Sequence, residues 1–235
     1  MSIESNLILS VLKLTKKGSA LIEDTKREAR LPAASIRKLL RRLQKEGLVY
    51  LKLNRIEVDS GMRLKLAVKA TSLGTDMERI SNLLCWQEFE EIAALALKGY
   101  GYKTASNVRF KHAARKWEMD VIGCKKPLVI CIDCKHWQRA ISPSGLRRIV
   151  DSQVERTEAL ADSLPNISLK LECTQWTKAQ FVPCIVSLTP NSFKFYGAIP
   201  IVPIFQLQDF LNQLPAYATQ LKLFEKTFNS LSQNF

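Results

Sequence analysis

Apolar residues recur at helical spacing in the first part of the chain. Two segments, 5–17 and 19–30, predict the first two helices, and Leu31-Pro32 ends the second. The segment 32–47 predicts a third helix, because its apolar residues fall at i, i+3, i+4 and i+7 and Gly47 ends it. The apolar positions of this third helix are Ile36, Leu39, Leu40 and Leu43.

Two segments with strand-like patterns follow the third helix. They cover 48–53 and 63–68, and Asp59-Ser60-Gly61 between them is typical of a turn. Helices followed by a two-stranded ribbon resemble the winged helix-turn-helix fold, in which the third helix enters the major groove of DNA and the ribbon tip contacts the backbone. We therefore expect residues 1–74 to form a winged-helix DNA-binding domain.

The charge of this region agrees with a polyanionic partner. The chain has a formal net charge of +13, and residues 1–74 hold 16 Lys and Arg against 7 Asp and Glu. Basic residues surround the apolar face of the third helix and predict contacts with DNA phosphates. These residues are Arg37, Lys38, Arg41 and Arg42. Two alternatives stay open: the basic face is only solvated, or the domain serves protein interaction or dimerisation.

The pattern from residue 75 onward alternates helices and strands. This order is typical of an α/β domain with a mixed sheet, so we expect a second domain at 75–235. The expected helices cover 76–98, 143–163 and 206–214, and the expected strands cover 102–110, 118–122, 128–135, 181–188 and a segment ending at Ile204. The terminal segment 220–235 has apolar residues at a/d-like spacing, which predicts docking on this domain or a dimer interface.

No apolar run approaches the roughly 18 residues that a membrane-spanning helix needs. The N-terminal segment has neither the basic leader nor the cleavage site of a signal peptide. We therefore expect a cytoplasmic protein with reduced thiols and no membrane partner. Cys131 and Cys134 form a C-x-x-C pair, but on a strand they point to opposite faces and no second such pair completes a zinc site.

Candidate chemistry lies on two of the expected strands. Asp120 lies on one strand, and Asp133 and Lys135 end the next on a common face, because side chains alternate along a strand. The 13-residue spacing of the acids suits a hairpin that brings the carboxylates side by side. Adjacent carboxylates repel each other unless a cation lies between them, and oxygen ligands of this kind suit Mg²⁺ or Mn²⁺.

These residues resemble the PD-(D/E)xK nuclease superfamily over about residues 85–205. Asp120, followed after a turn by Ile132-Asp133-Cys134-Lys135, matches its D…(D/E)-x-K signature. Trp86-Gln87-Glu88-Phe89-Glu90-Glu91 is similar to the F-E helix of Mrr-like restriction enzymes and archaeal Holliday-junction resolvases, and Cys134-Lys135-His136-Trp137 to the C-K-x-W of the Mrr-like branch. Met119 departs from the common proline, and the second acid is aspartate. The resemblance implies a restriction-endonuclease-like mixed sheet flanked by helices.

The resemblance also implies roles for four residues. Asp120 and Asp133 would bind the metal, and Glu90 would contact it directly or through water. Lys135 would orient or help deprotonate the attacking water and stabilise the charge on the phosphate. Plainer alternatives stay open: Asp133 and Lys135 form a surface ion pair, Asp120 is a strand-end turn acid, and Glu90 is a solvated helix residue.

Further basic residues flank the motif and are candidate phosphate contacts. The expected DNA contacts are Lys111, Arg115, Lys116, Arg139 and Arg147, with Arg109, Arg148 and Arg156 as further candidates. Gln153 resembles the glutamine that some superfamily members place near the site. The only two histidines, His112 and His136, stay outside the catalytic set; His136 alternates to the face opposite Lys135.

Together these features predict a Mg²⁺-dependent endodeoxyribonuclease that docks on DNA through its winged helix. The alternative is a DNA-binding regulator or scaffold with an inactive nuclease fold, and the presence of every carboxylate and the lysine speaks against it. An RNA-processing nuclease is a third hypothesis. Resolvases and many restriction enzymes are two-fold dimers, so the resemblance also raises a homodimer as one arrangement.

Overall fold

The computed structural model describes residues 2–76, 79–80, 82–135, 142–165, 169–187, 195–217 and 219–228. The chain divides into two compact units, Met1–Glu88 and Phe89–Phe235. The functional boundary expected after residue 74 stays a prediction.

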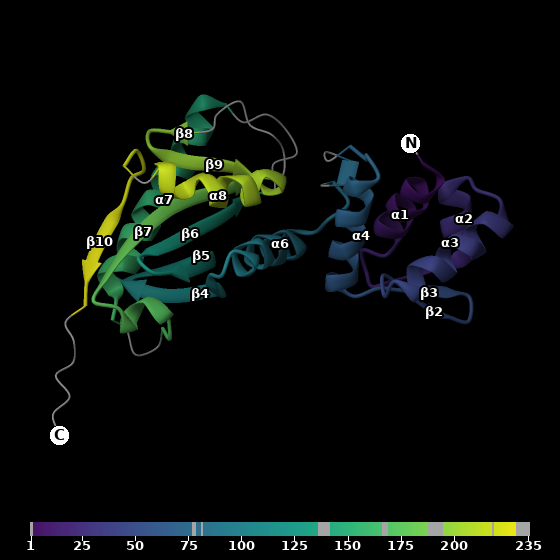
Figure 1. Ribbon diagram of the computed structural model, residues 1–235, viewed down its shortest axis with the longest axis horizontal. Helices are drawn as coiled ribbons and strands as arrows, with labels where there is room; N and C mark the ends of the chain where they lie inside the picture. Colours follow the sequence, from purple (N-terminus) through teal and green to yellow (C-terminus); the bar gives the residue numbers. More distant parts are fainter. Residues whose placement is uncertain are drawn as a thin grey trace, which may run out of the picture. The chain divides into compact units, whose positions relative to one another are not determined.

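The first unit combines helices with a small antiparallel sheet (Figure 1). Its elements are α1 (Ile3–Leu14), β1 (Ser19–Leu21), α2 (Ile22–Ala29), α3 (Ala33–Lys45), β2 (Tyr50–Lys52), β3 (Arg55–Glu57) and α4 (Ser60–Ser72). The strand order is β1-β3-β2. The predicted third helix is present as α3, and Ile36, Leu40 and Leu43 form its buried face.

Three predictions for this unit are wrong. The segment 63–68 is not a strand but lies in α4, and the expected turn is the start of that helix: Asp59 is the N-cap, and its side chain accepts a hydrogen bond from the backbone N–H of Met62 at 2.7 Å. The hairpin is instead formed by β2 and β3. The second helix also begins later than expected, because β1 occupies its first residues.

A mixed seven-stranded sheet forms the second unit, which confirms the predicted fold class. Its helices are α6 (Trp86–Gly99), which begins just before the unit, α7 (Pro143–Ser163) and α8 (Leu207–Tyr217). Its strands are β4 (Lys103–His112), β5 (Arg115–Lys125), β6 (Leu128–Lys135), β7 (Lys178–Ser187), β8 (Phe195–Tyr196), β9 (Ile199–Pro203) and β10 (Phe224–Thr227). The strand order is β4-β5-β6-β7-β9-β8, and β10 pairs with β7. Short 3₁₀ turns lie at Glu172–Gln175 and Ile204–Gln206.

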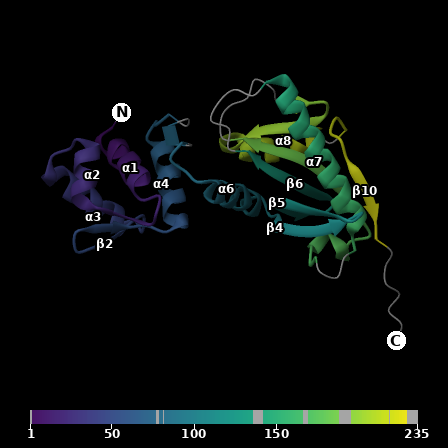
Figure 2. The same ribbon diagram turned by 180° about the vertical axis from the view of Figure 1, so that it is seen from behind.

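Helices cover both faces of this sheet. One core cluster packs α6 and α8 against it, including Phe89, Ile130 and Ile132. The cluster on the other face packs α7 and includes Val129 and Cys131, and Figure 2 shows α7 crossing that face. The alternation predicted for β6 is therefore confirmed. Two antiparallel hairpins, β4–β5 and β5–β6, join a parallel β6–β7–β9 section, so the carboxyl ends of β6, β7 and β9 share one edge.

Two details of this unit differ from the sequence predictions. Of the helix expected at 76–98, the part from Trp86 onward is α6. Residues 77, 78 and 81 lie outside the described residues. In the terminal segment, Phe224–Thr227 forms the strand β10, which the sequence predictions did not include. Leu221 and Phe228 are buried in the two cores of the sheet, so the predicted docking on this unit is confirmed up to Phe228; residues 229–235 lie outside the described residues. Within the described part of the chain, no helix is both long and apolar enough to cross a membrane.

Candidate active site

The hairpin expected from the acid spacing is present. β5 and β6 pair antiparallel with Val121 opposite Ile132, next to both acids. The backbone N–H of Cys134 donates a hydrogen bond to Oδ2 of Asp120 at 2.7 Å, which joins the two strands at this point. Asp120 and Asp133 therefore lie on adjoining strands, and Lys135 ends the second one.

Asp133 is a buried acid held by two cations. Its residue is 2% exposed. Lys135 Nζ lies 2.9 Å from Oδ1 and 2.8 Å from Oδ2, and Arg156 Nη1 of α7 lies 2.5 Å from Oδ1. The ion pair with Lys135 is present, but its acid is inside the protein rather than on the surface.

Asp120 and Glu90 share a negatively charged environment. Burial raises the pKa of Asp120, the N–H of Cys134 lowers that pKa, and the negative charge of Asp133 raises it. Burial, followed by the charges of Asp120 and Glu118, raises the pKa of Glu90 to about 7. Oε1 of Glu90 is buried and has no hydrogen-bond partner among the described residues. Burial is the largest cause of both raised pKa values, and the neighbouring carboxylates add to it.

Glu90 and its neighbour Glu88 have different surroundings in the structure. Glu88 belongs to the first unit, where it forms a buried ion pair with Arg63 of α4 and accepts from the backbone N–H of Cys85 at 2.7 Å. Its carboxylate therefore has a structural role. Glu91 is exposed at the surface of α6. The charges of Asp120 and Asp133 contribute to the raised pKa of Glu90, which remains the candidate of this acidic group.

Gln153 and Arg156 connect α7 to the acids. Gln153 is fully buried, and its Nε2 donates to the carbonyl of Cys131 at 2.7 Å. Arg156 Nη1 donates to Oε1 of Gln153 at 3.1 Å as well as to Asp133. Sequence reasoning noted both residues but missed this network. Their spacing of three on a helix, which puts them on one face, was the available signal.

The donor set fits a divalent cation in part. The unpartnered Oε1 of Glu90 and the repulsion between Asp120 and Asp133 would both be relieved by a nearby cation. However, the described residues contain no group of three or more His, Cys, Asp or Glu side chains that could hold a metal ion. The arrangement fits a cation bound by one or two carboxylates with water and phosphate as its other ligands, which is how Mg²⁺ is usually held.

The basic residues predicted to contact DNA belong to both units. On α3, a shallow concave surface is lined by Ala34, Arg37, Lys38, Arg41, Arg42 and Lys45. Arg42 is also paired with Glu46 at 3.0 Å and with Glu4 at 3.4 Å.

The other predicted contacts belong to the second unit. Lys111, Arg115 and Lys116 lie at the end of the β4–β5 hairpin, where Arg115 stacks 3.8 Å from the Trp117 ring and pairs with Glu155 at 3.5 Å. Arg147 of α7 pairs with Asp151 at 3.7 Å. Arg139, His136 and Trp137 lie outside the described residues.

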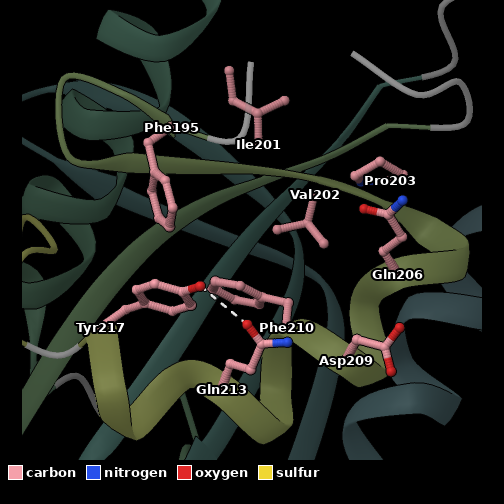
Figure 3. Close-up of a pocket in the computed structure, with 9 residues that line it drawn as sticks. All are labelled: Phe195, Ile201, Val202, Pro203, Gln206, Asp209, Phe210, Gln213 and Tyr217. Atoms are coloured by element: carbon pink, nitrogen blue, oxygen red, sulfur yellow. Dashed lines mark hydrogen bonds between the residues drawn. The ribbon is translucent and has the colours of Figure 1, made fainter. Parts of the chain in front are cut away.

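Another cavity lies between α8 and strands β8 and β9 (Figure 3). Its volume is about 310 Å³. Three aromatic rings line it together with aliphatic and polar side chains: the ring centroids of Phe195 and Tyr217 lie 5.3 Å apart, and the hydroxyl of Tyr217 donates to Oε1 of Gln213 at 3.0 Å. None of the predicted site residues lines this cavity.

Comparison with protein families identifies the stretch that carries the acids. Residues 82–160 match the family model Mrr_cat, described as a restriction endonuclease and of PD-(D/E)xK type. This stretch contains Glu90, Asp120, Asp133 and Lys135, and it ends in α7 after Arg156. The expected family is therefore confirmed for this stretch.

Individual relatives add little about function. A protein of Archaeoglobus fulgidus, described as uncharacterized, is 26% identical over 136 residues, which is 57% of this chain and 95% of that protein. Among solved structures, a protein of unknown function, AF1548, shares 15% identity with a TM-score of 0.33, over 49% of this chain and 56% of the other. Protein VC1899 from Vibrio cholerae shares 14% identity with a TM-score of 0.41, over 93% and 52%. The chain thus spans about half the length of these solved chains, and likenesses of this size define no function.

Proposed function

Because residues 82–160 match a restriction endonuclease family, we propose that this chain is a nuclease that hydrolyses DNA phosphodiester bonds with the help of Mg²⁺ or Mn²⁺. The observation that supports the proposal most is the grouping of Asp120, Asp133 and Lys135 at the β5–β6 hairpin, inside the matched stretch. Asp120 is half-buried and Asp133 is buried, and two such acids on adjoining strands destabilise the fold. Such destabilising pairs are typical of functional sites rather than of structural cores.

Each residue receives a role in this proposal. Asp120 and Asp133 would hold the divalent cation, with Glu90 as a further carboxylate toward it. A divalent cation bound at such a site lowers the pKa of a water molecule and polarises phosphoryl oxygens. Lys135 would orient the attacking water and place a positive charge beside the phosphate, where negative charge develops during hydrolysis.

DNA docking is the second part of the proposal. The helices and small sheet of the first unit support a winged-helix role, with the α3 surface facing the DNA. Arg37, Lys38 and Arg41 form no ion pair within the described part of the chain, so their charges are available to phosphates. Arg42 is different because Glu4 and Glu46 already neutralise it.

This difference supplies a matched test of docking. Replacing both Arg37 and Arg41 by Gln should weaken duplex binding and reduce the slope of log K against log salt by about 0.9 for each phosphate that the variant no longer neutralises. Arg42→Gln, with its charge already paired, should have a smaller effect. Equal binding and equal salt slopes in the double variant and the wild type would contradict docking through α3.

Activity is tested on a panel of substrates. The purified chain is incubated with linear duplex, branched and single-stranded DNA and with RNA, in Mg²⁺ and in EDTA. The proposal predicts Mg²⁺-dependent cleavage of at least one DNA substrate. DNA binding without cleavage of any substrate in Mg²⁺ or Mn²⁺ would favour the scaffold hypothesis, and cleavage confined to RNA would replace DNA as the substrate.

A further inference from the structure

A small cavity lies beside the acids, between the end of β6 and one face of α7. Its volume is about 350 Å³. β6 contributes Asp133 and Lys135, and α7 contributes residues at helical spacing: Gly145, Arg148, Ile149, Ser152 and Arg156. Three cations and one carboxylate therefore line the cavity. An excess of two positive charges suits an anion such as a phosphate group.

Arg156 is the residue that links this cavity to the acids. Its side chain is 19% exposed, so most of it is fixed inside the protein. Within the described part of the chain, its hydrogen bonds to Asp133 Oδ1 and to Gln153 Oε1 both start from Nη1. Nε and Nη2 are left for a ligand, and the planar guanidinium can bind two phosphate oxygens at once.

The partner of Arg156 is also the acid that the nuclease proposal assigns to the cation. Asp133 is 2% exposed and carries one negative charge, which it shares with Arg156 and Lys135. A cation that binds Asp133 competes with both side chains for the same two oxygens. Cation binding would therefore weaken the hold on Arg156 and raise the positive charge that faces the cavity.

We propose that Arg156 is a ligand for a substrate phosphate. Without a cation, Asp133 binds Arg156, and a divalent cation at Asp133 releases the arginine into the cavity. This inference rests on the proposed nuclease function for the identity of the anion, a backbone phosphate of the nucleic acid. Cation and phosphate then bind cooperatively, and thermodynamic linkage requires each to tighten the other by the same factor. A strong anion site forms only after the cation is in place.

Phosphate binding without catalysis tests the release of Arg156. The probe is phenyl phosphate, a monoester with no phosphodiester bond, and its affinity for the full chain is measured by ³¹P NMR titration. The wild type should bind the probe about tenfold more tightly in Mg²⁺ than in EDTA, a coupling in the range seen for linked sites. Asp133→Asn should bind it tightly even in EDTA, because the neutral amide no longer holds Arg156.

A second variant isolates Arg156 itself. Adding Arg156→Gln to Asp133→Asn should abolish the gain in EDTA, whereas adding Arg156→Lys should keep part of it. Lys178→Gln is the matched control, because Lys178 of β7 also pairs with a carboxylate, Glu225 at 2.7 Å, but does not line the cavity. Thermal unfolding of every variant by circular dichroism identifies those that are folded, and the Lys variant replaces the Gln variant if the latter unfolds.

Two results would overturn the inference: equal affinity of wild type and Asp133→Asn in EDTA, or undiminished affinity after Arg156 is replaced. The nuclease proposal fails separately. If no nucleic acid is cleaved but the phosphate titrations follow this pattern, Arg156 remains a cation-released phosphate ligand. If DNA is cleaved but the titrations do not follow the pattern, the cavity is not its phosphate site.

Discussion

Replacing Arg63 by Met should destabilise the first unit more than any exposed charge change. Arg63 is 4% exposed and pairs with Glu88, which is 1% exposed. It also donates to the carbonyls of Leu12 at 2.6 Å and Leu83 at 2.8 Å, and to the hydroxyl of Thr15 at 2.9 Å. Met keeps the apolar stem but leaves Glu88 charged and buried without its cation. Breaking a buried pair from one side costs about 3–5 kcal/mol.

The expected loss is large enough for a thermal measurement. For a unit of this size, Met1–Glu88, each kcal/mol moves Tm by roughly 4–8 °C, so Tm of this unit should fall by at least ~12 °C. Calorimetry of the full chain measures this shift. Adding Glu88→Leu to Arg63→Met should recover much of the loss, because no unpaired charge then remains. Lys26→Met, which breaks an exposed pair with Glu23, is the control and should cost less than ~1 kcal/mol. An unchanged Tm in Arg63→Met would refute the reasoning.

Three further changes test other features. Glu90 has a pKa raised to about 7, so the folded state binds its proton more tightly than the unfolded state. In EDTA, the unfolding free energy of the second unit should therefore fall as pH rises from about 4.5 to 7. Glu90→Gln should flatten this slope, and equal slopes in variant and wild type would contradict the shift. Leu53 is 98% exposed and has a φ of 53°, a left-handed backbone conformation that favours Gly and Asn. Leu53→Asn should therefore stabilise the first unit by up to ~1 kcal/mol in urea unfolding. Destabilisation would show that the backbone at Leu53 is not strained. Lys135→Met should still bind divalent cation in calorimetry but lose about two orders of magnitude in cleavage; normal cleavage would remove Lys135 from the reaction.

The core of the second unit was predictable because its local patterns agree with its tertiary structure. β6 covers Leu128–Lys135 and α7 covers Pro143–Ser163, as expected from the sequence. In α7, the N-cap Ser142 accepts from the backbone N–H of Gly145, and Pro143 begins the helix, so its start is encoded by adjacent residues. The buried run of β6 is encoded in the same direct way.

Other elements depend on contacts that no local pattern reveals. The segment Arg63–Val68 alternates apolar and basic residues like a strand, but the N-cap Asp59 and the buried pair of Arg63 favour a helix. The strand β10 exists because it pairs with Phe181 and its neighbours in β7, more than 40 residues away. Period-two and period-four patterns overlap in such short segments, so packing decides between them.

Some features of the candidate site were likewise predictable from the sequence, and others were not. Asp133 and Lys135 share a face because they are two residues apart on one strand, which the sequence already implies. Asp120 joins them through a hairpin of predictable length. The burial of Glu90 and the pairing of Arg156 with Asp133 require α6 and α7 to pack on opposite faces of the sheet. These contacts join residues distant in the sequence, so sequence reasoning could name the residues but not their interactions.

The most direct measurement compares DNA cleavage by Asp120→Asn, Asp133→Asn and wild type in Mg²⁺, on the DNA that the wild type cleaves best. Both variants should remain folded, should keep duplex binding through the α3 surface, and should cleave at least ~100-fold more slowly. Asp151→Asn, an exposed acid of α7 paired with Arg147, should cleave like the wild type. Cleavage at the wild-type rate by both Asp120→Asn and Asp133→Asn would contradict the assignment of the active site.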